Sequence, residues 1–398
     1  MFHLFERLVD PYPDAVPATP PRGFFTFMWA CTVGMRRYIA AMTLFTAGIG
    51  AFEAVLFAML GSIVDWLSHV PRERLWTDER ARLLLLAGIL AASLIMVALQ
   101  STLKQQTLQG NFPMRLRWNF HRLLLRQSLS FYQDEFAGRI ATKVMQTALA
   151  VRDTWMTVCD ILVFIVIYFV TLLAVVGSFH LGMLLPMLGW LALYLLTLRH
   201  FVPRLSRVSK VQADARSLMT GRITDAYTNI ATVKLFAHDR REAAHARSAM
   251  QEFLQTVHAQ MRLVTGFEIV IHALSMVLIL ATAGAALALW MRGEVGVGAV
   301  AAATAMALRL NGISHWIMWE MATLFEHIGT VQDGIGTLSR APTITDAPDA
   351  RALRVERGEI RFEDVSFGYA GGPRVIEHFD LTIRPGEKIG LVGRSGAG

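Results

Sequence analysis

Six apolar stretches long enough to cross a lipid bilayer dominate this chain of 398 residues. A helix needs about 17–25 predominantly apolar residues to span the hydrocarbon core. Only 17% of the residues are charged, whereas a soluble chain carries about 25%. Because backbone polar groups in lipid must be satisfied within the protein, these stretches predict six transmembrane helices. They lie at about 38–66, 83–103, 157–177, 181–198, 264–290 and 296–318.

The distribution of basic residues predicts which side of the membrane each loop occupies. The turn between the third and fourth stretches has no lysine or arginine, and the turn after the fifth has only Arg292. The segments after the second and fourth stretches are strongly basic, with Arg115, Arg117, Arg122, Arg126, Arg199, Arg204, Arg207 and Lys210. The positive-inside rule therefore predicts cytoplasmic termini and long loops, in a cell membrane such as the bacterial inner membrane. Basic residues that flank spans explain the net charge of +7 without a nucleic-acid partner.

One loop opposes this topology. Residues 67–82, between the first two stretches, carry Arg72, Arg74, Arg80 and Arg82, which acidic neighbours offset only in part. The N-terminal segment, residues 1–37, predicts an extended proline-rich lead-in and a short interfacial helix rather than a cleaved signal peptide. Two cysteines, Cys31 and Cys159, support neither a disulfide framework nor a metal site.

The two long basic segments predict helical extensions of the spans, each interrupted near its middle. The first interruption covers residues 130–139 and the second covers 224–232. An ordinary helix–turn–helix tip explains either one alone, whereas two matched tips on the same side favour a mechanical role. The residues proposed for that role are Phe131, Tyr132, Gly138, Asp225, Tyr227 and Asn229. The sequence thus predicts a transmembrane domain over 38–340, followed by a linker over 341–356.

After the linker, the apolar period changes from helical to alternating. Phe379, Leu381 and Ile383 alternate with polar residues, and the earlier strand over 360–367 slips once at Glu363-Asp364, as a bulge would. The apolar run 389–392 predicts a buried strand that leads into a glycine-rich loop. That loop, Gly393, Arg394, Ser395, Gly396, Ala397 and Gly398, supplies six positions of G-x-x-x-x-G-K-[ST]. Glycines let backbone N–H groups approach phosphate oxygens closely. Residues 357–398 therefore predict the N-terminal part of an α/β nucleotide-binding domain.

Taken together, these motifs resemble an ABC exporter half-transporter over residues 22–398. The most specific segments are 362–369, which reads FEDVSFGY, and 385–398, which reads PGEKIGLVGRSGAG. The runs TNIATVKLF at 228–236 and FYQDEFAG at 131–138 are similar to the family's two coupling regions. The resemblance implies an all-α six-helix transmembrane domain with long cytoplasmic extensions, followed by the first strands of a P-loop domain.

The resemblance also implies cofactors and partners. In that family a tyrosine at the Tyr369 position stacks on adenine; the alternative is an aromatic residue in a strand-end core. ATP and Mg²⁺ would be the cofactors, and both need loop residues beyond Gly398. We expect a chain about 200 residues longer, from the usual size of a domain. Residues 1–398 then supply no catalytic residue, and hydrolysis would require the longer chain. A second half-transporter would complete a dimer.

Polar residues inside the apolar stretches are the candidates for substrate contact, since such residues are costly in lipid. The sequence places Glu53 and Arg309 at similar depth, with Glu268 and His272 sharing one helix face. We expect an acid of the first or fifth span to pair with Arg309, either in a cavity or as a structural ion pair. The complete set is Glu53, Glu268, His272, Arg309, Asn311 and His315.

The function predicted from these features is ATP-driven export of a small hydrophobic or amphipathic substrate. Aromatic and methionine side chains in the sixth span suit varied apolar cargo, although packing or lipid contact explains them equally: Trp316, Met318, Trp319 and Met321. Three alternatives remain open: a non-hydrolysing scaffold or partner subunit, an exporter of a peptide or other specific metabolite, and an importer permease.

Overall fold

The computed structural model describes residues 2–15, 17–69, 71, 73–133, 137–347, 349–355, 358–368 and 374–393. At a few of these positions, including His315 and Met318, only the backbone is described. The chain forms two compact units, Met1–Thr343 and Ile344–Gly398. The first unit is helical and the second contains a small sheet.

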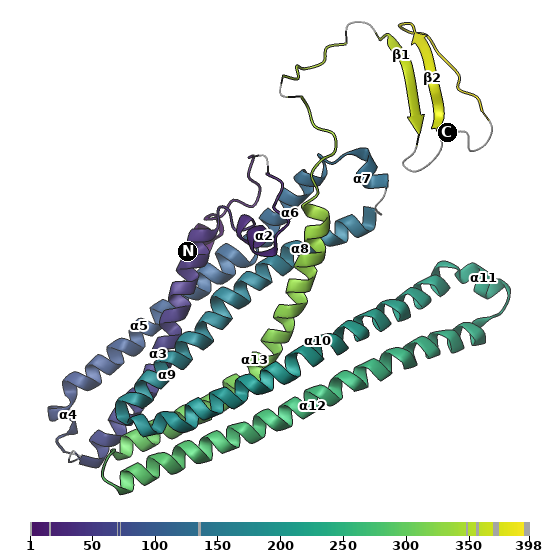
Figure 1. The fold of residues 1–398 in the computed structure, drawn as a ribbon. Helices are drawn as coiled ribbons and strands as arrows, with labels where there is room; N and C mark the ends of the chain where they lie inside the picture. Colours follow the sequence, from purple (N-terminus) through teal and green to yellow (C-terminus); the bar gives the residue numbers. More distant parts are fainter. Residues whose placement is uncertain are drawn as a thin grey trace. The chain divides into compact units, whose positions relative to one another are not determined.

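The helical unit contains short helices at its start and long helices afterwards (Figure 1). The elements before the first loop tip are α1 (Phe2–Glu6), α2 (Phe24–Ala30), α3 (Arg36–His69), α4 (Leu75–Asp78), α5 (Arg80–Thr102), the π-helix η1 (Leu103–Gln109) and α6 (Asn111–Leu124). Those that follow are α7 (Leu129–Gln133), α8 (Ala137–Met156), the π-helix η2 (Thr157–Leu162), α9 (Val163–Phe179), the 3₁₀ turn η3 (Leu181–Met183), α10 (Leu184–Thr228), α11 (Ile230–Leu235), α12 (Asp239–Met291) and α13 (Val297–Leu338).

Within the described residues, six helices are long and apolar enough to cross a membrane. This confirms the six predicted spans and makes the chain a multi-pass membrane protein. The helices extend well past the apolar stretches, as the loop patterns predicted. Their ranges are Arg36–Ser68, Arg80–Leu124, Gly138–Phe179, Leu181–Thr228, Asp239–Met291 and Val297–Leu338.

The helices are arranged around α13, which contacts α3, α8 and α12. Helices α10 and α12 lie side by side, and α11 joins them at their tip (Figure 1). We call the side of the membrane where α13 ends at Leu338 the linker side. One buried apolar cluster lies there, around α2, α6, α8 and the end of α13. A second cluster joins α9, α10, α12 and the first half of α13.

The lead-in before α2 forms an N-terminal strap, defined here as residues 2–15 and 17–22, along α6. Donor side chains at helical spacing on η1 and α6 bind its backbone carbonyls. Asn111 Nδ2 lies 2.8 Å from Glu6 O, and Arg115 Nη1 lies 2.7 Å from Asp10 O. Arg122 donates to the carbonyls of residues 13, 14 and 15. Proline-rich backbone lacks N–H donors, so side-chain donors on the helix hold the strap by its carbonyls.

Spans one and six approach most closely where α13 begins. A Cβ on Gly298 would lie 2.0 Å from Gly61 O and 2.5 Å from Asp65 Cγ. Asp65 Oδ1 accepts the Gly298 N–H at 2.6 Å, so the carboxylate satisfies a backbone donor in the first turn of α13. Glycine at position 298 therefore permits both the backbone contact and the cap.

The second unit contains β1 (Ile360–Gly368) and β2 (Arg374–Ile383), which pair antiparallel. The register shifts between Phe362 and Val365, and Asp364 has φ +49°. This confirms the bulge that the sequence indicated at Glu363-Asp364. The hairpin agrees with the start of the predicted P-loop domain.

One local prediction was wrong, and a second was correct only in part. Residues 389–392 do not form a strand, and Val392 is 99% exposed, because a buried strand requires neighbouring strands and the described part of the sheet contains only β1 and β2. The second interruption begins inside the predicted range 224–232 but extends beyond it. α10 continues to Thr228, and the breaks fall at Asn229 and at residues 236–238.

The Gly298 contact predicts a steric cost of substitution. Gly298→Ala should destabilise the protein by about 1–3 kcal/mol, the usual cost of overpacking. Gly312→Ala, on the same helix with nothing within 4 Å of the added Cβ, is the matched control and should be neutral or slightly stabilising. Thermal unfolding of the detergent-purified protein measures both; equal melting temperatures for the two variants would contradict the close approach.

Candidate functional site

An ion pair between the first and sixth spans forms the centre of the candidate site. Arg309 Nη2 on α13 lies 2.8 Å from Glu53 Oε2 on α3. The two side chains keep 46% and 30% of their surface exposed, respectively. The structure therefore confirms that Arg309 pairs with an acid, and the partner is Glu53. Because both groups stay partly open, the pair can contact a molecule outside the helix bundle.

A buried aromatic side chain lies near this pair. The Tyr168 side chain of α9 is 1% exposed, lies within electrostatic reach of both charges and stacks on Phe164 with ring centroids 5.9 Å apart. Asn311 follows Arg309 on α13, and its buried Oδ1 has no hydrogen-bond partner among the described residues. His315 lies one turn further along α13, but its side chain is outside the described set.

The two polar residues of the fifth span lie apart from this pair. Glu268 and His272 are exposed and line one shallow hollow on α12 with Ile269 and Ala273. The shared face agrees with their i, i+4 spacing. Neither side chain forms an ion pair with any residue that the structure describes. Of the two expected partners of Arg309, an acid of the first span or of the fifth, the structure therefore shows the first-span acid Glu53.

A second polar cluster, which sequence reasoning missed, joins the first three spans. The Asp160 carboxylate is 7% exposed and accepts hydrogen bonds through both oxygens. Lys104 Nζ lies 2.6 Å from Oδ2, and Thr46 Oγ1 lies 2.6 Å from Oδ1. Gln100 Nε2 lies 2.9 Å from the same Oδ1. This Asp160 cluster satisfies a buried carboxylate completely with three donors from α3, α5 and η1.

Both charged members of the Asp160 cluster lie in π-helical turns. Lys104 belongs to η1 and Asp160 to η2. A π turn inserts one extra residue into a helix and changes the direction of its side chains. Here the two π turns occur where the Lys104 and Asp160 side chains meet. The acidic residue at the fourth position of the predicted third span was a signal that could have pointed to Asp160, but not to its partners.

The first loop tip is tied to the segment that follows α13. Phe131 is buried, and the Arg340 guanidinium lies 5.7 Å from its ring centroid. Ser128 Oγ lies 2.5 Å from Thr343 Oγ1. The Tyr132 hydroxyl donates to Leu124 O at 2.7 Å, and desolvation raises its pKa, so it remains protonated. Gly138 lies in the first turn of α8.

The second loop tip presents apolar side chains to its surroundings. Leu235 is 79% exposed, Phe236 is 61% exposed and Tyr227 is 71% exposed. Asn229 separates α10 from α11, and its Nδ2 donates to Asp225 O at 3.0 Å. Asp225 and Tyr227 lie in the last turn of α10 rather than in the break. α11 is therefore an exposed apolar helix at the end of a long helical pair.

Most of the predicted nucleotide site lies outside the described residues. Tyr369 follows the end of β1, and Arg394, Ser395, Gly396, Ala397 and Gly398 follow Gly393; none of these six is described. The described part of the chain also contains no group of three or more His, Cys, Asp or Glu residues able to hold a metal. The ATP and Mg²⁺ predictions therefore rest on the sequence motif alone.

Comparison with known proteins gives a family and a close relative. The family described as the ABC transporter transmembrane region matches residues 39–313. A Haemophilus influenzae protein described as an uncharacterized ABC transporter ATP-binding protein is 53% identical over 398 residues. The match covers 100% of this chain and 65% of that protein. The chain therefore spans less than two thirds of the length of this relative.

More distant matches agree on the architecture. The β-(1→2)-glucan export ATP-binding/permease protein NdvA of Rhodopseudomonas palustris is 26% identical over 372 residues, covering 90% of this chain and 60% of that protein. A solved bacterial Atm1-family ABC exporter with ATP bound has a TM-score of 0.66. It covers 88% of this chain and 61% of that structure at 17% identity, which shows a shared fold.

The Asp160 cluster predicts a non-additive response to mutation. Lys104→Met leaves a buried carboxylate without its counter-charge and should cost about 3 kcal/mol of stability. Lys104→Met combined with Asp160→Leu should recover much of that loss, because the unpaired charge is gone. Lys143→Met is the control, since its partner Asp333 is 65% exposed and the cost should stay below about 1 kcal/mol. Melting temperatures in detergent measure all three; equal losses from Lys104→Met and Lys143→Met would contradict the prediction.

Proposed function

The chain belongs to the ABC transporter family, and on this premise we propose that the full-length protein is an ATP-driven exporter of small hydrophobic or amphipathic molecules. The observation that carries the proposal is the half-open Glu53–Arg309 pair, which joins the first and sixth spans inside an otherwise apolar region. A charged pair in the membrane is costly unless it has a task or a complete set of partners. The Asp160 cluster has a full set of partners, whereas the Glu53–Arg309 pair retains exposed surface.

The half-open pair suits an amphipathic substrate in particular. A polar group on the substrate can hydrogen-bond with the carboxylate or the guanidinium, while its apolar part contacts the surrounding side chains. Trp316 and Trp319 on the same helix are 39% and 52% exposed and supply adaptable aromatic surface. Met321 lies near them and is partly buried. These features support a hydrophobic or amphipathic cargo over a fully polar one.

The energy for export would come from ATP bound beyond β2. ATP, held with Mg²⁺ by the phosphate loop that begins at Gly393, supplies the free energy when the domain is complete. The exposed apolar helix α11 and the linker-bound first tip are the parts of this chain suited to receive movement of that domain. No residue of α11 is buried, and Leu235 is 79% exposed, which supports docking on a nucleotide-binding domain.

The proposed orientation and partner follow from charge and family. We infer from the basic segments that the N-terminal strap, both tips and the nucleotide-binding domain are cytoplasmic, and that the substrate is taken from the cytoplasm or the inner leaflet. A second half-transporter, identical or different, would complete the assembly. No nucleic acid is required as a partner.

Substitution of the ion pair tests the proposal. The full-length protein in proteoliposomes should hydrolyse ATP faster when an amphipathic substrate is added. Arg309→Met should reduce that stimulation by at least about tenfold while leaving basal hydrolysis intact, because a charged contact to the substrate is lost. Lys143→Met, which removes a charge from the linker-side half of α8, is the control. If substrate stimulates ATP hydrolysis by Arg309→Met as strongly as by the wild type, the pair has a structural role only. If the wild type hydrolyses no ATP at all, the scaffold function is favoured.

Substitution at the second tip tests coupling separately. Leu235→Ser and Phe236→Ser should lower transport by about tenfold or more, since each removes apolar surface from a docking contact. Melting temperatures should not change, because both side chains are exposed. Leu218→Ser, an exposed position on α10 away from the tip, is the control. Normal transport in both tip variants would argue against docking through α11.

A further inference from the structure

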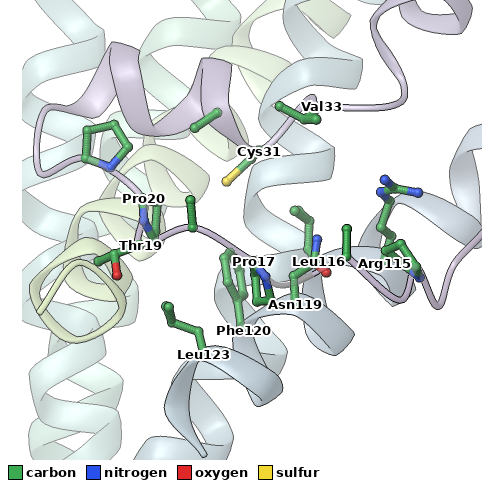
Figure 2. A pocket seen from close by; sticks show the side chains of 15 residues that line it. Pro17, Thr19, Pro20, Cys31, Val33, Arg115, Leu116, Asn119, Phe120 and Leu123 are labelled. Carbon is green, nitrogen blue, oxygen red and sulfur yellow. The ribbon is translucent and has the colours of Figure 1, made fainter. Parts of the chain in front are cut away.

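A cavity lies between the N-terminal strap, α6 and the segment after α2, far from the Glu53–Arg309 pair in sequence. Its volume is about 360 Å³, which is within the range of small-molecule sites. Figure 2 shows Phe120 and Leu123 rising from α6, and the Cys31 sulfur turned toward the strap. The described strap residues that line it are mostly prolines and alanines: Pro13, Ala15, Pro17, Ala18, Thr19, Pro20 and Pro21.

The apolar part of the cavity wall is deeply buried. Leu116, Phe120 and Leu123 on α6 are 3–4% exposed. Strap prolines cover the opposite side, and Val33, which is 56% exposed, lies at the edge. An apolar moiety could therefore be enclosed on two sides while the cavity stays open to the outside.

The polar groups of the cavity favour an anion. Among the described residues that line it, Arg115 is the only charged one and none is acidic. Arg115 Nη1 donates to Asp10 O, whereas its buried Nε has no hydrogen-bond partner in the part of the chain that the structure describes. The Asn119 amide lines the same cavity. Burial raises the pKa of the Cys31 thiol to about 12, so this side chain contributes no negative charge at neutral pH.

The surroundings place this cavity near the membrane surface. Phe25 and Trp29 on α2 are 85% and 54% exposed, as expected of a helix whose aromatic side chains lie in the interfacial region. The Arg36 guanidinium lies 4.1 Å from the Trp29 ring centroid. The cavity behind α2 is thus within reach of molecules that enter from the headgroup region.

We propose that this cavity is a binding site for an anionic amphiphile, whose phosphate or carboxylate pairs with Arg115 and Asn119 and whose apolar part packs against Phe120 and Leu123. A guanidinium with a free Nε is the donor that suits an oxyanion. The occupant would connect the strap to α2 and α6. Its source would be an anionic lipid of the bilayer; a free oxyanion held by Arg115 without an apolar part is the alternative that the experiment below distinguishes. The site does not depend on transport activity.

Binding can be measured by thermal stabilisation of the full-length protein in detergent. The probes are dioctanoyl phosphatidylglycerol, dioctanoyl phosphatidylcholine and inorganic phosphate. We expect phosphatidylglycerol to raise the melting temperature in a saturable way and phosphatidylcholine to have no effect. If inorganic phosphate raises the melting temperature and competes with phosphatidylglycerol, the ligand is a free oxyanion bound at Arg115 and the lipid part of the proposal is wrong.

Three variants locate the effect. Arg115→Met should weaken phosphatidylglycerol binding at least about tenfold, through loss of a charge-assisted hydrogen bond. Arg117→Met, which removes the same charge from α6 at a position that does not line the cavity, should bind as the wild type does. If Arg115→Met fails to fold, Asn119→Leu, which keeps a similar volume, should weaken binding several-fold. Equal stabilisation of wild type, Arg115→Met and Asn119→Leu, or stabilisation by both lipids alike, would overturn the proposal.

Discussion

A polar group inside a bilayer must find its partner within the protein, and in this chain α13 provides partners over its whole length. Its first turn donates to Asp65 on α3, and Arg309 pairs with Glu53 further along. The Ser314 carbonyl accepts from Tyr194 on α10, and Asp333 pairs with Lys143 on α8. Ser339, directly after the helix, donates to Pro21 of the strap. The first half of α13 is therefore fixed to α3 and its second half to α8. The linker begins directly after this helix.

The distribution of polar contacts separates two kinds of charged group. The Asp160 carboxylate is buried and accepts hydrogen bonds from three helical elements, so its effect is to hold the first three spans together. Glu53 and Arg309 satisfy each other but stay open. In a medium of low dielectric constant, the fully paired Asp160 cluster stabilises the fold, whereas the Glu53–Arg309 pair can still form hydrogen bonds with a ligand. The same contrast appears at Arg115, where Nη1 holds the strap and Nε has no partner among the residues that the structure describes.

Sequence alone predicted the six spans, the long helical extensions and the bulge near Asp364, because each follows from a local period of apolar residues. It also predicted that Arg309 pairs with an acid of the first or fifth span, and it placed Glu53 and Arg309 at similar depth. It missed the Asp160 cluster, whose geometry depends on π turns that no period reveals. The strand expected at 389–392 failed for a different reason: its burial depends on neighbouring strands and not on its own composition. The strap was predicted as an extended segment, but its attachment to α6 arises from donors about 100 residues away in sequence.

The attachment of α13 to α8 can be measured directly by electron paramagnetic resonance distances in the full-length protein. Spin labels at Met145 on α8 and Phe325 on α13, both exposed positions, would be compared without nucleotide and with ATP and Mg²⁺. Cys31 and Cys159 would be replaced by alanine, and labelled protein diluted with unlabelled copies. We expect the same distance distribution in both states, because α8 and α13 move as one body. A shift of about one helical turn, ~5 Å, would contradict that account.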